Sequence, residues 1–526
     1  MKLIRPNILS PTDGSFSRAS VGTYVDADNI LKVAGVNQPR FHYLDGEFQG
    51  ILVEPAATNL ITNSEILLSN TGTTVIADTE LAPDGTTTAD LFVETATLGQ
   101  HYSRESYSVA ANTTLTFSAF VKRPVGVTRR ISLLITGCYA IFDFDLKDFT
   151  YVSNTDSLGS ESIGNDYYRI WITKYYASSS TIDASITLAN TNNDYSYLGD
   201  TAEKIIVWGR QLESGSRPSS YIKTSGSAVT RAADVITGSG FIYSSAINAD
   251  ANYAAGTTYA LGNRVTYSGK IYESLQNTNT GHAPDTSLTW WLLIGPDNKH
   301  AALDNSVSTV SSATGELTLV VKPGAINSCG LVDMAGSLFE FAMRDLTDGV
   351  IFSQTIGLSG IEVNNWYDYF FLSPLIEMRR TQYIFQDLPS QYTDPIVTLR
   401  IKNGTEAAKL ALASFGFLSE IGEVEYGASA GIVDFSVKST DDYGNTSLVQ
   451  RNFSKRLSAR CFVPNRDINR VQRTLYSIRA TPVVWIGVDD PTYEEAMIVW
   501  GFYKDFTTEI SYPTYSLISI EIEGLS

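Results

Sequence analysis

Paired carboxylates are the side chains of this 526-residue sequence that come closest in type to a hydrolytic centre. Three adjacent pairs occur, at Asp441–Asp442, Asp489–Asp490 and Glu494–Glu495. Glycosidic cleavage needs two carboxylates that flank the bond to be broken. Neighbouring residues of a strand point to opposite faces of a sheet, so an adjacent pair on a strand cannot supply that arrangement. A catalytic pair formed by carboxylates that are distant in the sequence and meet on folding remains an alternative.

Histidine and the known catalytic motifs offer less. The four histidines are far apart, at His42, His101, His282 and His300, and no HExxH motif places two of them on one helix face. No GxSxG, P-loop or GxGxxG occurs in the strand–helix context that these motifs need. We therefore expect no catalytic residue and no cofactor.

Two turns are rich in the oxygen ligands that Ca²⁺ prefers. They are NTNNDYSYLGD (190–200) and DDYGN (441–445). Asn and Asp are also frequent in ordinary turns, where their side chains bond the backbone of the turn itself. The sequence therefore predicts no metal site, with calcium at either turn as the alternative.

Aromatic rings are the other groups that could bind a ligand, and residues 251–296 concentrate them. Val265 and Tyr267 alternate before a Ser268–Gly269 turn, and residues 271–272 begin a return strand, which predicts a hairpin. The wider pattern consists of Gly262, Val265, Tyr267, Gly269, Tyr272, Pro284 and Trp290–Trp291.

This pattern resembles that of the small carbohydrate-binding modules attached to chitinases, in which exposed rings stack on sugars. The apolar area and the quadrupole of a ring both favour such stacking. A module of about 45 residues also needs aromatic side chains for its core. Because neighbouring strand residues face opposite ways, we expect either Trp290 or Trp291 to be exposed. Tyr272 and Trp291 are the predicted sugar-binding residues.

Strands with a two-residue period must position these groups. Between about residues 70 and 215, the period is clear in LTFSAFVK (115–122), AIFDFDL (140–146) and YYRIWITKY (167–175). Phe117, Leu146 and Ile170 are among the residues expected to face a core, with the opposite face of each strand in water. Turns rich in Gly, Asn and Ser separate the strands and favour an antiparallel jelly roll or β-sandwich.

A second sandwich is predicted from about 300 to 425. Its strands include SLFEFAMRDL (337–346) and WYDYFFL (366–372), and IVTLRIKNGTEAAKLALASFGF (396–417) is interpreted as two strands joined at Asn403–Gly404. From about 426 a helix joins the strands, with Ile468, Val471, Leu475 and Ile478 at helical spacing, and Pro482 prevents its continuation. The predicted fold class is therefore mainly β, with serial jelly-roll or β-sandwich domains, a small β-hairpin module and a C-terminal α+β unit.

Aromatic side chains gather again near the C-terminus. A concentration of this kind can mark a core or an interface. The candidate interface residues are Trp500, Phe502, Tyr503 and Phe506. We expect the C-terminal unit to anchor the protein in a larger assembly, with the N-terminal segment 1–65 as the alternative anchor.

The stretch WGRQLESGSRPSSYIKTSGSAVTRAADV (208–235) is unusually polar for a segment between two well-patterned ones. Its strand end WGRQLE, its SYIKT turn and its TRAAD exit resemble the end of a jelly-roll module of bacteriophage tail and fibre proteins. Residues 16–65 are similar to the leader that precedes such modules. The resemblance covers about the first 235 residues. It implies a lectin-like fold for that part. Together with the strand and helix patterns of the rest of the chain, it predicts five parts, namely a leader (1–65), a jelly roll (66–235), a small module (236–300), a second sandwich (301–425) and an α+β domain (426–526).

Bulk properties exclude several classes of partner. The net charge of −18 repels nucleic-acid phosphates and anionic lipid surfaces. No apolar run approaches the ~20 residues of a membrane-spanning helix, so membrane insertion is not expected. Cys138, Cys329 and Cys461 form no CxxC pair, which predicts neither a disulfide framework nor a zinc site.

Together these observations predict a non-enzymatic bacteriophage virion component, part of a tail, tail tip, collar or fibre. It would be assembled in the host cytoplasm, dock on other virion proteins, form a homo-oligomer with cyclic symmetry and contact cell-surface glycans of the host. The alternative is a tailspike-like enzyme that depolymerises polysaccharide and carries these modules for targeting. That enzyme would need a catalytic domain such as a long β-helix, and no short internal repeat indicates one.

Overall fold

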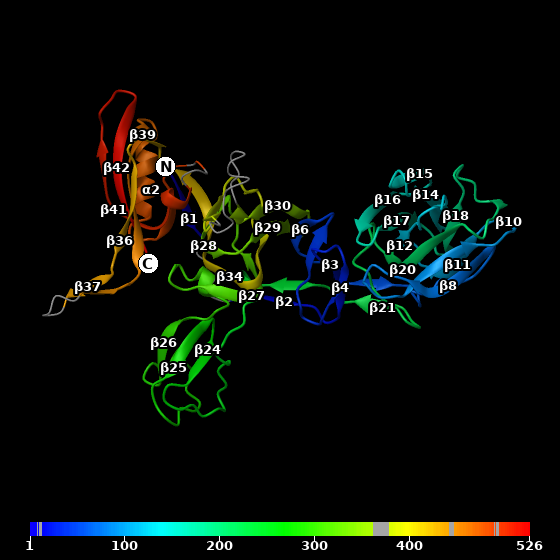
Figure 1. Ribbon diagram of the computed structural model, residues 1–526, viewed down its shortest axis with the longest axis horizontal. Coiled ribbons are helices and arrows are strands. Elements are labelled where there is room, and N and C mark those ends of the chain that lie inside the picture. The colour runs from blue at the N-terminus through cyan, green and yellow to red at the C-terminus, as the bar shows by residue number, and fades with distance from the viewer. Residues whose placement is uncertain are drawn as a thin grey trace. The chain divides into compact units, whose positions relative to one another are not determined.

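Strands dominate the chain in the computed structural model, which describes residues 1–7, 9, 13–360, 378–440, 446–488, 490 and 494–525 (Figure 1). The described α-helices are α2 (Ile468–Ser477) and α3 (Glu494–Met497), and the strands form antiparallel sheets. The predicted mainly-β fold class is confirmed. The strand predicted at 366–372 lies outside the described residues. Neither of the described α-helices is long and apolar enough to cross a membrane.

The chain divides into two compact units. Unit 1 combines Met1–Ser15 with Gly238–Ser526, and unit 2 is the intervening segment Phe16–Thr237. Residues 1–65, which the sequence predicted as one leader, are therefore shared between both units. The five-part division is finer than this one and stays a prediction.

Two adjacent strands carry the chain into and out of unit 2. Strand β2 (Ser15–Ser17) pairs with β22 (Val235–Thr237). Beside them, the Gly14 N–H donates to the Phe241 carbonyl at 2.8 Å. A Cβ added to Gly238 would lie only 2.7 Å from the Gly14 Cα. Unit 2 is thus an insertion between two neighbouring points of unit 1.

Two sheets of unit 2 form a β-sandwich, with strand orders β16-β17-β12-β20-β9-β8 and β11-β18-β13-β14-β15. Their bounds are β8 Thr73–Glu80, β9 Ala89–Glu94, β11 Tyr102–Val109, β12 Thr113–Lys122, β13 Arg130–Ile135, β14 Cys138–Asp143, β15 Asp148–Ser153, β16 Ser157–Ile163, β17 Tyr167–Tyr176, β18 Ser180–Ala189 and β20 Lys204–Ser214. Phe117 and Ile170 lie in the core between the sheets, as predicted. Leu146 is exposed instead, because β14 ends before it, at Asp143.

The outer face of the six-stranded sheet is buried as well. Val25 and Leu31 pack there against Phe120, Trp208 and Tyr221 in a second core. The segments that bring this cover include β3 (Gly22–Val25), β4 (Leu31–Ala34), β5 (Phe41–Leu44), β6 (Glu47–Ile51) and β7 (Ala57–Asn59), which pairs with β21 (Val229–Arg231). The expectation that one face of this sheet is exposed to solvent is therefore wrong, because residues 16–65 supply apolar atoms that cover that face.

One sheet runs through unit 1 in the order β23-β27-β34-β1-β40-β41-β42-β39-β35. Its strands are β23 (Gly240–Ser244), β27 (Ser311–Lys322), β34 (Ile396–Glu420), β1 (Lys2–Pro6), β40 (Val483–Ile486), β41 (Ile498–Glu509), β42 (Tyr515–Gly524), β39 (Phe453–Pro464) and β35 (Glu423–Val424). Strand β1 pairs with β34 on one side and with β40 on the other. The first residues of the chain thus join the second sandwich to the C-terminal part.

Strand β34 corrects the prediction of two strands in 396–417. Its 25 residues run without reversal through Asn403–Gly404. The register against β27 shifts there, and Gly404 has φ +59°. A bulge bends a strand without reversing it. Strands β28 (Ser328–Ala335) and β29 (Leu338–Asp345) also pair with β34, and β29 buries Phe339, Phe341 and Met343 as expected.

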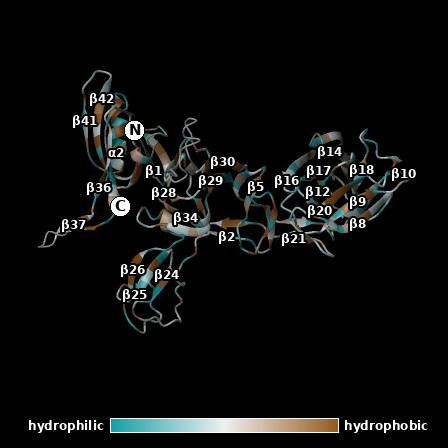
Figure 2. Ribbon diagram, in the orientation of Figure 1, coloured by the Kyte–Doolittle hydropathy of each residue, from teal (hydrophilic) through white to brown (hydrophobic). Residues whose placement is uncertain are grey.

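The C-terminal helix and the small module follow the sequence pattern closely. Helix α2 buries Val471 and Leu475 against the sheet, as its spacing predicted. In the small module, β24 (Arg264–Tyr267), β25 (Lys270–Ser274) and β26 (Trp291–Pro296) form a three-stranded sheet that contains the predicted hairpin. Apolar residues recur along the strands of both units, as the brown segments in Figure 2 show.

Candidate functional site

A bulge in β20 shapes the site in unit 2. Phe120 of β12 pairs with Trp208 and Ser118 pairs with Gln211, so β20 carries one extra residue between these pairs. Gly209 in the bulge has φ +59°, and a Cβ on it would lie 2.8 Å from the Phe120 ring. One extra residue exchanges the two faces of a strand. The residues that follow Gly209 are therefore turned over relative to those before it.

The exchange places polar groups on the covered face. Val207 before the bulge and Leu212 after it both lie in the sandwich core. Gln211 and Glu213 consequently share the outer face with Trp208. Continued alternation would have put these two polar side chains into the apolar core.

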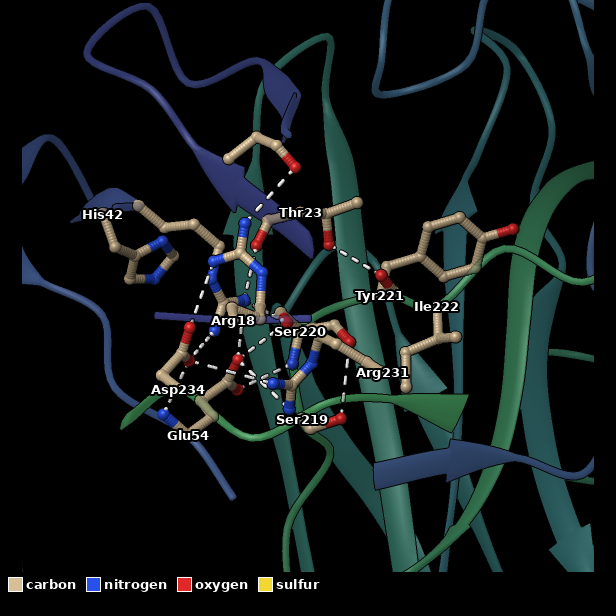
Figure 3. A network of polar contacts seen from close by, with 12 residues as sticks. Arg18, Thr23, His42, Glu54, Ser219, Ser220, Tyr221, Ile222, Arg231 and Asp234 are labelled. Carbon is tan, nitrogen blue, oxygen red and sulfur yellow. Dashed lines mark hydrogen bonds and ion pairs between the residues drawn. The ribbon is translucent and has the colours of Figure 1, made fainter. Parts of the chain in front are cut away.

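Charged side chains fill the space between residues 16–65 and the chain exit after β20. Asp234 accepts hydrogen bonds from Arg18 Nη1 at 3.1 Å, from Arg40 Nη2 and from the Glu54 backbone N–H at 2.9 Å (Figure 3). The side chains of Arg18, Arg40 and Asp234 are all 0% exposed. Asp234 therefore ties together three segments of the covering chain.

Glu54 is the second anion of this polar core. Its carboxylate pairs with Arg40 Nη1 at 2.8 Å and Arg231 Nη2 at 3.4 Å. It also accepts the N–H and the hydroxyl of Ser220 at 2.8 and 2.7 Å (Figure 3). Three guanidinium groups thus share two carboxylates, Glu54 and Asp234.

Glu213 and Gln211 fold the polar turn beside this core. The Glu213 carboxylate accepts the N–H and the hydroxyl of Ser219, both at 2.7 Å. The Gln211 side-chain oxygen accepts the Ile222 N–H at 2.7 Å. Tyr221 and Ile222 are buried and anchor this turn. The half-buried serines donate hydrogen bonds to Glu213 and Glu54, so this end of the turn is held against the polar core.

The electrostatics keep Glu54 ionised at neutral pH. Desolvation alone would raise the pKa of Glu54, but Arg40, Arg231 and the Ser220 bonds outweigh it and hold that pKa below its usual value. Burial lowers the pKa of Arg18 and of Arg231. Guanidinium groups nevertheless stay protonated in proteins. Removing one partner from a buried ion network leaves uncompensated charge, which is strongly destabilising.

A cavity of about 110 Å³ lies against the polar core. Its lining includes Tyr24, His42, Glu54, Phe120, Glu161, Arg169, Ser219 and Ser220. The two serine hydroxyls donate to Glu213 and Glu54, and His42 Nδ1 accepts the Val25 N–H at 3.2 Å. No serine–histidine pair forms among these three residues, and the arrangement favours binding over nucleophilic chemistry.

The structure buries both predicted sugar-binding residues of the small module. Tyr272 is 5% exposed and Trp291 is 1% exposed, and both pack with Tyr259. The Trp291 Nε1–H also donates to the His282 carbonyl at 2.8 Å. The expected exposure of these two rings is wrong, because the module has few other apolar side chains for its core. Trp290 is half-buried and stacks on the His282 ring with centroids 3.9 Å apart.

The predicted interface residues near the C-terminus also belong largely to packed structure. Trp500 is buried, and its Nε1–H donates to the Asn305 carbonyl at 3.2 Å. Trp500 as an interface residue is therefore wrong. Tyr503 and Phe506 are half-buried against the core below α2. Docking through the half-buried Phe502 stays a prediction.

The alternative of calcium at the two Asn- and Asp-rich turns gains no support from the described residues. Asn190 Oδ1 accepts the N–H groups of Asn192 and Asp194 at 2.9 Å each, so this oxygen serves its own turn. The turn at 441–445, Asp489 and the Glu494 side chain lie outside the description. In the described parts of the chain, no group of three or more His, Cys, Asp or Glu is placed to hold a metal ion.

Sequence reasoning noticed Arg231 and Asp234 but not their partners. Arg18 and Arg40 precede Asp234 by 216 and 194 residues, so no local pattern could join them. The signal in the sequence was that residues 16–65 and residues 208–235 both resemble parts of the same class of phage protein. Their meeting in one polar core follows from neither stretch alone.

Comparisons with known proteins give no family for this chain. No family model and no curated protein matches it. The structure of the CBM22-1–GH10 modules of Clostridium thermocellum xylanase 10B in complex with xylohexaose shares 14% identity over 32% of this chain and 30% of that chain, with a TM-score of 0.19. The ANXUR2 extracellular domain of Arabidopsis thaliana shares 8% identity over 68% of this chain and 90% of that chain, with a TM-score of 0.16. Likeness at this level defines neither the fold nor the function of the chain.

Proposed function

We propose that this chain is a structural component of a bacteriophage virion, part of a tail, tail tip, collar or fibre. In this role it docks on other virion proteins and on further copies of itself, and it contacts glycans on the host cell surface. The observation that carries the proposal is that both phage-like stretches of unit 2 meet in one polar core.

The two stretches contribute complementary halves of that core. Residues 16–65 supply Arg18, Arg40 and Glu54, and residues 208–235 supply Arg231 and Asp234. Ion pairs between the two sets, such as Arg18–Asp234 and Arg231–Glu54, help to neutralise their buried charges, and buried charges need partners. Two separate sequence resemblances thus correspond to one folded module. This dependence supports a common origin with the leader and jelly roll of phage proteins.

The carboxylates of the core are engaged in ways that favour a structural role over catalysis. Asp234 bonds two guanidinium groups and a backbone N–H, and Glu54 bonds two guanidinium groups and Ser220. A general acid or nucleophile must be free to reach a substrate. This supports the virion role over the depolymerase alternative for unit 2.

Immunogold labelling tests the proposal. An antibody raised against the purified full-length chain is applied to particles released from lysed host cells, with pre-immune serum as the control. We expect regular labelling of one substructure of the tail, collar or fibre. If the antibody detects the chain only in the soluble lysate and the particles carry no label, the proposal is contradicted.

A polysaccharide digest separates the enzyme alternative. The purified chain is incubated with envelope polysaccharide of the host, and new reducing ends are measured over time. We expect none above the heat-denatured control. Shortened oligosaccharides whose release is abolished by Glu161→Gln or Glu54→Gln would establish the depolymerase and refute the non-enzymatic role.

A further inference from the structure

Arg169 of β17 is a buried cation without a carboxylate partner. Arg169 is 6% exposed, and its guanidinium carbon lies 5.2 Å from the centre of the Phe120 ring. Nη2 donates to Ser118 Oγ at 3.2 Å, and Nε meets no acceptor. No carboxylate of residues 16–237 lies within ion-pair distance of it, and Glu213, Glu161 and Glu54 act on its charge from farther away. A buried charged donor without a hydrogen bond is costly, so an acceptor placed beside Nε would stabilise it.

Glu161 of β16 is a partly exposed carboxylate beside Arg169. It stands directly opposite Arg169 in the register of β16 and β17. Opposite charges in this position normally attract each other, but these two do not form an ion pair. Residues 16–237 give the Glu161 carboxylate no hydrogen bond, and its nearest ion-pair partner is His42 Nε2 at 4.0 Å. Burial raises the pKa of Glu161, and the charge of Arg169 offsets this rise only in part.

Both groups line the cavity of about 110 Å³, and apolar side chains form much of the remaining wall. Tyr24, Phe120 and Ile163 contribute apolar surface there. An engineered cavity of roughly 150 Å³ binds benzene, so this one has room for a few carbon atoms and their substituents. The Glu161 side chain is 21% exposed, so solvent reaches this carboxylate at the wall of the cavity.

We propose that this cavity binds a hydroxyl-bearing part of one sugar residue, with Arg169 donating to one hydroxyl oxygen and Glu161 accepting from a neighbouring hydroxyl. A hydroxyl group both donates and accepts, so two neighbouring hydroxyls meet both needs at once. The two charges cancel, so the pair favours a neutral ligand. Phe120 and Tyr24 offer apolar surface to the C–H groups of a sugar ring. The inference rests on the glycan contact in the proposed function and places that contact in unit 2, away from Tyr272 and Trp291.

Saturation-transfer NMR on the full-length chain tests this site. Free glucose, galactose, rhamnose and N-acetylglucosamine are each offered alone at millimolar concentration. At least one is expected to show transfer that falls about tenfold in Glu161→Gln and in Arg169→Met, because each variant loses a charge-assisted hydrogen bond. Glu47→Gln, at an exposed glutamate of the same unit, should leave the transfer unchanged. Since Arg169→Met could disturb folding, the decisive variant is Glu161→Gln at the partly exposed position, checked by an unchanged melting temperature.

Several results would overturn the inference. Absence of transfer from every sugar, or transfer unchanged in Glu161→Gln, would do so. Transfer from free glycine but not from sugars, lost in the same variants, would assign the cavity to an amino-acid zwitterion instead. The virion role fails separately: labelled particles without sugar transfer refute only this inference, and site-dependent transfer with unlabelled particles refutes only the virion role.

Discussion

Two short regions of the chain reach burial through opposite chemistry. The exit from unit 2 buries Arg231 and Asp234 in a network of ions and hydrogen bonds. The small module buries Tyr272 and Trp291 in a cluster of rings. From the sequence alone, the first was an unusually polar stretch between two patterned segments, and the second resembled an exposed binding surface. The structure buries the named residues of both.

Comparison of the two regions shows that residue type does not determine exposure. A charged side chain can be buried when opposite charges and hydrogen-bond partners are buried beside it, as Glu54 and Asp234 are beside the arginines. An aromatic ring leaves the surface when a small module has little other apolar area, as in residues 251–296. Substitutions in each core should therefore destabilise the region that contains it and leave the other region intact.

The largest effect is expected from Asp234→Asn in the ion core. The amide keeps the shape but removes the charge that neutralises Arg18 and Arg40. Breaking a buried ion network typically costs about 3–5 kcal/mol of unfolding free energy. Hydrogen exchange of peptides from residues 16–237 should accelerate, while peptides from unit 1 stay protected. Asp166→Asn, at a side chain that is 94% exposed, is the matched control, and equal exchange in both variants would contradict the ion core.

A somewhat smaller effect is expected from Trp291→Ala in the aromatic core. Truncating a buried ring costs about 3–5 kcal/mol, and the loss is limited by the modest stability of so small a module. Peptides from 251–296 should exchange rapidly while unit 2 is unaffected. Leu292→Ala, at the exposed neighbour on the same strand, should change little. If both variants exchange alike, the module does not depend on its ring cluster.

Gly209→Ala tests the bulge that turns Gln211 and Glu213 to the outer face. Left-handed backbone costs a residue with a Cβ about 1–2 kcal/mol, and contact with the Phe120 ring adds overpacking of about 1 kcal/mol or more. Denaturation of unit 2 should therefore begin at lower denaturant concentration. Gly85→Ala is the control, because Gly85 has φ +82° with nothing within 4 Å of an added Cβ. A loss no greater than that of Gly85→Ala would exclude a steric role for Gly209.

The smallest effect is a difference in pH response between the units. In unit 1, burial would lower the pKa of His300, but Asp297 and Asp13 outweigh burial and raise it. His300 therefore contributes stability below its unfolded pKa of about 6.5, and that contribution is lost as pH rises through the folded value. Glu54 in unit 2 acts oppositely, because its lowered pKa gives stability above about pH 4.3 that is lost on acidification.

Hydrogen exchange around residues 297–304 should therefore speed up between pH 6 and 8 after correction for the intrinsic rate. Exchange around residues 219–222 should speed up only in acid. His300→Gln should abolish the first response and leave the second intact. A response near 297–304 that survives this substitution would assign it to another group.

The sequence predicted local features well because they depend on neighbouring residues. The alternation around Phe117 and Ile170, the helical spacing of Val471 and Leu475, and the hairpin near Ser268 all appear as expected. Leu146 failed because a strand end was misplaced by a few residues. Such errors are expected where turn residues compete with an alternating pattern.

The candidate site could not be predicted in the same way. Arg40 and Asp234 are 194 residues apart, and nothing local in either one indicates the other. The cover over the six-stranded sheet and the uninterrupted β34 likewise depend on contacts made only after folding. Burial of Trp291 follows from how little apolar area the module has, which strand alternation alone does not measure.

The paired strands β2 and β22 have a consequence for how such a protein could evolve. Because the chain leaves unit 1 and returns to it at neighbouring points, everything between them can be exchanged as a cassette without rerouting a single strand of the remainder. Genetic recombination at these two points would replace one displayed domain with another and preserve the scaffold that carries it.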